Sequence, residues 1–263
     1  HAYAPKTDRV LWIGMGAGVV PMQFAADGID TDVVEINGAS ISMAEEFFDF
    51  DASQVNLTVG DGRQFLNQTD RTYDAILLDA FLGDSSPSHL MTHEAFVEMR
   101  AHLSDHGALV INSFGESNPE RQFFSSSLDK TLRSVFGSER VIVHASGYGN
   151  VFFVATKAPQ LKVHHSPEPN PEAGKRLRTA ESERDAYAVW NEWYAAAKGV
   201  GPFFSEHPQV QMEMALMWTG RREFDASRGQ LLLDDFNPVE FYDARNREEN
   251  RRGLIHQIDP GNG

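Results

Sequence analysis

The chain has 263 residues, 41% of them hydrophobic, which is enough apolar material for one large domain or for a domain with a smaller appendage. No apolar run approaches the roughly 20 residues of a membrane-spanning helix, and the absence of cysteine excludes disulfides and cysteine nucleophiles. A formal net charge of -15 argues against nucleic acid as a partner and favours a cationic substrate.

Short apolar runs alternate with helical patterns between residues 10 and 157, which predicts strand and helix units wound into a mostly parallel sheet. The predicted strands cover residues 10–13, 32–36, 56–59, 75–79, 108–112, 140–144 and 151–156, and the predicted helices cover residues 19–27, 39–48, 63–67, 93–103 and 120–136. The last two strands are separated by a short stretch with two glycines, which predicts a hairpin. This seven-stranded α/β arrangement resembles the Rossmann-like fold of the class I S-adenosylmethionine (SAM) methyltransferases.

The pattern changes after Lys157, where prolines interrupt a polar stretch that predicts a linker or a surface crossing. Residues 183–198 and 209–218 then carry apolar side chains at helical spacing, and we interpret the aromatic members as packing contacts. We therefore expect a catalytic domain over residues 1–158, and over residues 159–263 a linker and a helical extension that packs on it. Asp234 and Asp235 precede an Asn-Pro pair, which favours a turn over a role in the site.

A glycine-rich loop follows the first predicted strand, in the segment VLWIGMGAGVV. Gly14, Gly16 and Gly18 allow the backbone to approach a ligand closely and to adopt positive φ angles. The dinucleotide fingerprint G-x-G-x-x-G needs a glycine at position 19, where this sequence has Val19. The spacing therefore disfavours a pyrophosphate and favours an adenosyl sulfonium ligand.

Two acids stand at the carboxyl ends of the second and third predicted strands. Glu35 is placed to accept hydrogen bonds from both ribose hydroxyls, and Asp61 to accept one from the adenine amino group, while Gly62 leaves room for the ring. A single acid at such a position is often only a helix cap. Together with the glycine loop, however, both acids converge on the edge at which open α/β sheets bind ligands.

The segment YDAILLDAFLGDSSPSHLMTHEAF places Asp79 at the carboxyl end of the fourth strand. With VLWIGMGAG, VVEIN and GDGRQFL, it resembles the spermidine synthases, or polyamine aminopropyltransferases, over residues 5–157. The resemblance implies transfer of an aminopropyl group from decarboxylated SAM to an amine such as putrescine, with release of methylthioadenosine. It also implies that Asp79 deprotonates and orients the amine, because an ammonium group cannot attack carbon.

The sequence departs from the family pattern at three positions. Ala17 stands where the family has an acid for the donor's amine, Leu82 replaces a second acid for the diamine, and Asn37 ends VEIN in place of VEID. Asp84 or His89 is a candidate substrate-binding replacement for the second acid. We interpret the chain as a divergent member that resembles the synthase-like domains attached to membrane-spanning segments, and it could be part of such a longer chain.

Two other functions stay open on the sequence alone. One is methyl transfer from SAM, and the other is a catalytically silent domain that binds an adenosyl ligand or a polyamine. We expect no metal site, because the histidines lack matching carboxylate spacing. The resemblance also implies a homodimer, and a cytoplasmic location follows from where the sulfonium donor is made.

Overall fold

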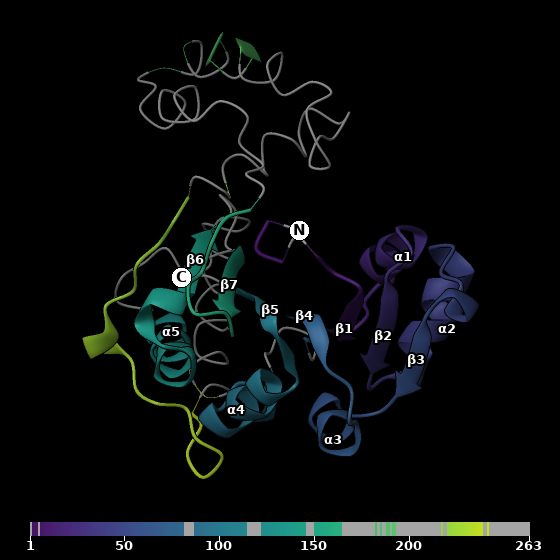
Figure 1. Cartoon of the computed structure of the whole chain (residues 1–263), viewed down its shortest axis with the longest axis horizontal. Helices are drawn as coiled ribbons and strands as arrows, with labels where there is room; N and C mark the ends of the chain where they lie inside the picture. Colours follow the sequence, from purple (N-terminus) through teal and green to yellow (C-terminus); the bar gives the residue numbers. More distant parts are fainter. Residues whose placement is uncertain are drawn as a thin grey trace, which may run out of the picture.

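The computed structural model describes residues 2–4, 6–81, 87–114, 122–145, 150–164 and 220–238, together with isolated positions between 182 and 241. A seven-stranded sheet with the strand order β3-β2-β1-β4-β5-β7-β6 forms its centre (Figure 1). The strands are β1 (Arg9–Ile13), β2 (Asp30–Glu35), β3 (Asn56–Val59), β4 (Tyr73–Leu78), β5 (Leu103–Phe114), β6 (Val141–Ala145) and β7 (Asn150–Thr156). Strands β1 to β5 pair in parallel, whereas β7 is antiparallel to both β5 and β6. The predicted methyltransferase-like sheet and its closing hairpin are therefore confirmed.

Helices cover both faces of the sheet because side chains alternate between the faces along each strand. Leu11 and Ile13 of β1 belong to the larger core cluster, which lies under α3, α4 and α5, while Trp12 belongs to the smaller cluster under α1 and α2. The helices are α1 (Val19–Ala26), α2 (Gly38–Phe47), α3 (Gly62–Gln68), α4 (His93–Ala101) and α5 (Phe123–Phe136). Figure 1 shows α1 and α2 beside β1 to β3, and α4 and α5 toward the other end of the sheet.

Several boundaries differ from the prediction by a few residues, and the one at Leu103 changes the type of element. The helix expected over residues 93–103 ends at Ala101, and Leu103 instead begins β5, where it is fully buried and pairs with Tyr73. Leu103 is apolar and lies at helical spacing, so its place in the sheet depends on pairing with a distant strand. The strand predicted over residues 108–112 is extended at both ends for the same reason.

The described part of the C-terminal region runs along the outside of the domain. Residues 220–238 pass beside α5 and turn back beneath α4 (Figure 1). Leu232 is fully buried in the larger core cluster, and the predicted turn is confirmed at residues 233–236 by two hydrogen bonds between Leu233 and Phe236. The helices predicted over residues 183–198 and 209–218 lie almost wholly outside the described residues, and the division at residue 158 stays a prediction. Within the described ranges, no helix is long and apolar enough to cross a membrane.

Candidate active site

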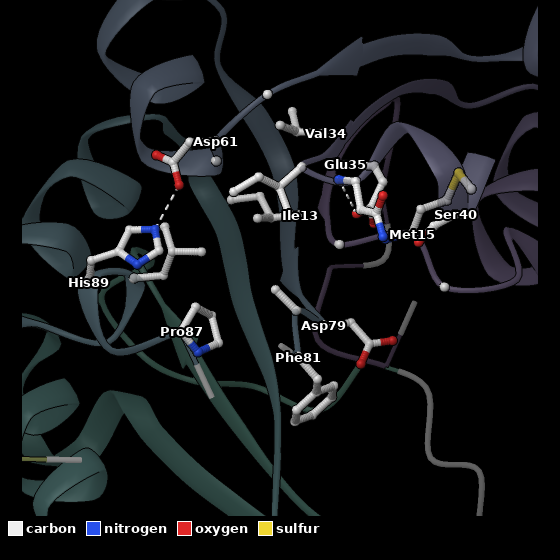
Figure 2. Close-up of a pocket in the computed structure, with 18 residues that line it drawn as sticks. Ile13, Met15, Val34, Glu35, Ser40, Asp61, Asp79, Phe81, Pro87 and His89 are labelled. Atoms are coloured by element: carbon white, nitrogen blue, oxygen red, sulfur yellow. Dashed lines mark hydrogen bonds and ion pairs between the residues drawn. The ribbon is translucent and has the colours of Figure 1, made fainter. Parts of the chain in front are cut away.

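A cavity of about 420 Å³ lies at the carboxyl ends of β1, β2 and β4. The strand order reverses between β1 and β4, and such a switch point is where open α/β sheets bind ligands. The loop after β1, the start of α3 and residues 87–90 complete the lining. Figure 2 shows Asp61 and His89 on one side of the cavity and Glu35 on the other, with Asp79 below them.

The glycine loop brings backbone directly against the end of β4. Gly14 has a φ of 86°, and a Cβ added there would lie 2.5 Å from the carbonyl oxygen of Asp79. Gly16 lines the cavity and has no atom within 4 Å of its added Cβ, so this stretch of backbone is open to a ligand. Gly18 does not line the cavity; it precedes α1 and packs against the ring of Phe50.

Glu35 is held in place by two backbone amides. Its side chain is nearly buried, with 7% of the residue exposed, and its two oxygens accept hydrogen bonds of 2.8 Å from the N–H groups of Met15 and Asn37. Each carboxylate oxygen has a second lone pair. The carboxylate is therefore oriented by the loop after β1 and still has acceptor capacity for a ligand's hydroxyl groups.

Asp61 serves both as the N-cap of α3 and as a partner of His89. One oxygen accepts from the backbone N–H of Gln64 at 2.9 Å, and the other lies 2.6 Å from Nε2 of His89 (Figure 2). Burial acts to raise the pKa of Asp61, but these hydrogen bonds outweigh it, so the pKa lies below its ordinary value. Asp61 is therefore ionised at neutral pH and accepts hydrogen bonds only.

Gly62 follows Asp61 in the first turn of α3. A Cβ added to Gly62 would lie 2.5 Å from Cγ2 of Ile13. The absence of a side chain therefore allows α3 to begin directly against β1, which brings Asp61 to the edge of the cavity.

Asp79 has a partner that the sequence did not reveal. Asn112 of β5 donates a hydrogen bond of 2.9 Å from Nδ2 to Oδ1 of Asp79. The Oδ1 atom of Asn112 is buried and has no hydrogen-bond partner among the described residues. In the register of β4 and β5, Leu78 lies opposite Ile111, which places Asn112 beside Asp79. Only knowledge of this strand pairing could have indicated the contact between Asn112 and Asp79 from the sequence.

The remaining candidates are distributed unevenly. His89 was predicted as a replacement for a diamine-binding acid, and the structure places it beside Asp61, on the opposite side of the view in Figure 2 from Glu35. Asp84 and Leu82 lie outside the described residues. Asn37 caps α2 by accepting from the N–H of Ala39.

The charges around the cavity are mostly negative. The described lining includes the carboxylates of Glu35, Asp61 and Asp79 and contains neither lysine nor arginine. Among the described residues, no group of three His, Asp or Glu side chains is placed to hold a metal ion. The arrangement is suited to a ligand that carries positive charge and several hydrogen-bond donors.

Several known proteins are similar to this chain in sequence. Residues 20–163 match the model of the spermine/spermidine synthase domain. The polyamine aminopropyltransferase of Vibrio vulnificus is 31% identical over 245 residues, which are 90% of this chain and 70% of that enzyme. Four of five further curated relatives are named as polyamine aminopropyltransferases, and the name of one of these four is marked as probable. The fifth is an N-terminal histidine N-methyltransferase. The chain spans 31% to 46% of the lengths of these five proteins.

Solved structures support the same fold. A probable spermidine synthase from Corynebacterium glutamicum aligns with a TM-score of 0.52 and 22% identity over 82% of this chain and 72% of that one. Human methyltransferase-like protein 13, solved in complex with SAH, aligns with a TM-score of 0.53 and 15% identity over 80% of this chain and 90% of that one. The fold, the family model and the Vibrio relative agree, and the chain belongs to the spermine/spermidine synthase family.

Proposed function

We propose that this chain transfers an aminopropyl group from decarboxylated SAM to a small amine such as putrescine, and releases methylthioadenosine. The observation that carries the proposal is the convergence of Glu35, Asp61 and Asp79 on one cavity beside the glycine loop. The names of the relatives, most of which are aminopropyltransferases, support the same reaction. A cytoplasmic location and a homodimer are part of this proposal.

Donor binding is assigned to the loop after β1 and to the two acids nearest to it. Glu35, oriented by the amides of Met15 and Asn37, accepts hydrogen bonds from the ribose hydroxyls. Asp61 accepts from the adenine amino group, and Gly16 allows close approach of the backbone to the nucleoside. The sulfonium charge is favoured by the carboxylates of the lining, because positive charge is stabilised near them.

The chemical step is a displacement at the carbon beside sulfur. The amine nitrogen forms the new C–N bond, the C–S bond breaks, and its electron pair passes to sulfur, which leaves as the neutral thioether of methylthioadenosine. The amine must first lose a proton, and Asp79 is the assigned acceptor of that proton. Asn112 fixes one oxygen of Asp79, which leaves the other oxygen to receive the proton and to orient the amine.

Replacement of Asp79 by Asn tests this assignment. The oxygen of the introduced amide can still accept from Asn112, so the local packing is preserved while the base is lost. We expect turnover to fall by a factor of about 100 or more, with the dissociation constant of methylthioadenosine unchanged. Asp70→Asn is the matched control, because Asp70 is exposed and precedes β4 at the opposite end of that strand from Asp79. Equal activity in the two variants would remove Asp79 from its role.

The products distinguish this reaction from other uses of the fold. The protein is incubated with SAM, with decarboxylated SAM and with a pool of diamines and polyamines, and the nucleosides are identified by mass spectrometry. Methylthioadenosine that appears only in the presence of an amine is the expected result. Adenosylhomocysteine, or no product at all, would overturn aminopropyl transfer for this chain.

A further inference from the structure

The segment formed by residues 229–238, here called the strap, contacts the side of the cavity on which Asp61 lies. Asp234 in the strap forms a two-pronged ion pair with Arg63 of α3, with N to O distances of 2.7 and 2.6 Å. Asn237, also in the strap, donates from Nδ2 to the carbonyl oxygen of Ser88 at 2.7 Å. The strap therefore holds two separate elements, α3 and residues 88–90, that line the cavity.

Both elements lead to one hydrogen bond inside the cavity. Arg63 lies in the first turn of α3, whose N-cap is Asp61, and it also donates to the carbonyl oxygen of His89 at 3.2 Å. Ser88 immediately precedes His89 in the chain. Because the strap fixes the backbone on each side of the 2.6 Å contact between His89 and Asp61, it sets the orientation of that pair.

The strap itself is firmly attached to the domain at its other end. Leu232 is fully buried, and its N–H donates to the hydroxyl of Thr131 in α5 at 3.0 Å. The carbonyl of Leu232 accepts from the N–H of His93 at 2.7 Å, and Asp234 accepts from the hydroxyl of Thr92 at 2.7 Å. The buried side chain of Leu232 and these short hydrogen bonds therefore fix the position of the strap against the cavity wall.

We propose that Arg63, Asp234 and Asn237 are positioning residues that fix the His89–Asp61 pair for recognition of the nucleobase amino group of the adenosyl ligand. The inference rests on the proposed function, because it assigns the nucleobase end of the ligand to Asp61. A carboxylate that is oriented on both sides presents its acceptor lone pairs to an amino donor without further loss of conformational freedom. The hydrogen bond from Arg63 lowers the pKa of Asp234, against the opposing effect of burial, so the ion pair persists at neutral pH.

The test is a double-mutant cycle of Asp234→Asn and His89→Ala in the full chain, with the dissociation constant of methylthioadenosine measured by calorimetry. We expect Asp234→Asn to weaken binding about tenfold, which corresponds to about 1.4 kcal/mol. In the His89→Ala background the same substitution should change binding less than about twofold. Equal losses in both backgrounds, or no loss in either, would overturn the inference.

Base discrimination supplies a readout that a merely structural role would not move. Methylthioinosine carries a carbonyl oxygen in place of the adenine amino group, so the position assigned to Asp61 no longer donates a hydrogen bond. The preference of the wild type for methylthioadenosine over methylthioinosine should shrink in Asp234→Asn and in Asn237→Asp, because Asp61 loses its orientation. An unchanged preference in these variants contradicts the inference.

Asp30→Asn is the matched control. Asp30 pairs with Arg9 at 2.8 Å and has the same 39% side-chain exposure as Asp234, but it lies at the start of β2, at the opposite end of that strand from Glu35. The dissociation constant of the Asp30→Asn variant for methylthioadenosine should equal that of the wild type. If Asp234→Asn does not fold, Asn237→Asp carries the same comparison through the independent anchor at Ser88. A wild type that does not bind methylthioadenosine would overturn the proposed function and this inference with it, whereas a binding wild type with unchanged variants would overturn the inference alone.

Discussion

Replacement of Glu35 by Gln changes a nearly buried carboxylate into an amide of the same shape. In the wild type, one oxygen accepts from the N–H of Met15 and the other from the N–H of Asn37, both at 2.8 Å. In the variant, one of these N–H groups faces the NH₂ of the new amide and loses its acceptor. The side chain also loses one of the two oxygens that we assign to the ribose hydroxyls.

The contacts give an expected magnitude for each effect. A hydrogen bond to a charged group contributes about 1.5–3 kcal/mol, so loss of one ribose contact should weaken methylthioadenosine binding roughly 10-fold to 150-fold. The backbone N–H left without a partner lies in a site where Glu35 is 7% exposed. An unsatisfied buried donor costs about 1–3 kcal/mol, which the free energy of unfolding should lose.

Calorimetry with methylthioadenosine and with its 2′-deoxy analogue separates the loss of ribose recognition from a nonspecific loss of ligand affinity. The wild type should prefer the ribose form, and Glu35→Gln should lose most of that preference while both ligands bind more weakly. Urea unfolding of the ligand-free proteins measures the loss of stability independently. If the variant keeps the full preference for the ribose form, Glu35 does not contact the ribose, and the assignment of this end of the cavity is wrong.

Three further changes test other parts of the description. Asn112→Ala should lower turnover about tenfold, because Asp79 loses its fixed orientation, and leave methylthioadenosine binding unchanged; steady-state kinetics and calorimetry check this, and weakened nucleoside binding would contradict it. Gly14→Ala should lower the free energy of unfolding by more than about 2 kcal/mol, because the new Cβ meets the carbonyl of Asp79 at a φ of 86°; a wild-type midpoint in thermal unfolding would refute the contact. The hydrogen bond from Arg9 holds the pKa of Asp30 in the folded protein below its usual value. The wild type should therefore be more stable than Asp30→Asn, and this advantage should be complete above the unfolded pKa of roughly 3.9. It should vanish as the pH falls through the lower folded pKa. Urea unfolding at pH 7 and at pH 3 measures that difference, and a difference that grows in acid would show that the sign is wrong.

Local sequence signals were sufficient for the parts of the site that lie at the ends of single strands. Glu35 and Asp61 each follow an apolar run and precede a helix, and the glycines of the loop stand in a recognisable spacing. These features depend on neighbours within a few residues. The structure places Glu35, Asp61 and Gly16 on the same cavity, which is where the sequence pattern expected them.

Contacts between distant segments were beyond the reach of sequence reasoning. The pairing of Leu103 with Tyr73 depends on two strands meeting, and the contact of Asn112 with Asp79 depends on their register. Arg63 and Asp234 are separated by 171 positions, so no local pattern connects them. The sequence predicts a turn at Asp234, which is confirmed, but contains no signal for the ion pair of Asp234 with Arg63.

The close approach of Gly14 to the backbone of Asp79 bears on any attempt to change which acceptor amine the protein takes. No side chain separates the glycine loop from the end of β4, and the N–H of Asp79 donates to the carbonyl of Ile13 at 2.9 Å. The spacing between the glycine loop and the end of β4 is thus set by main-chain atoms. Substitution of Phe81 or Pro87 in the cavity wall should therefore leave the spacing between the glycine loop and the end of β4 in place.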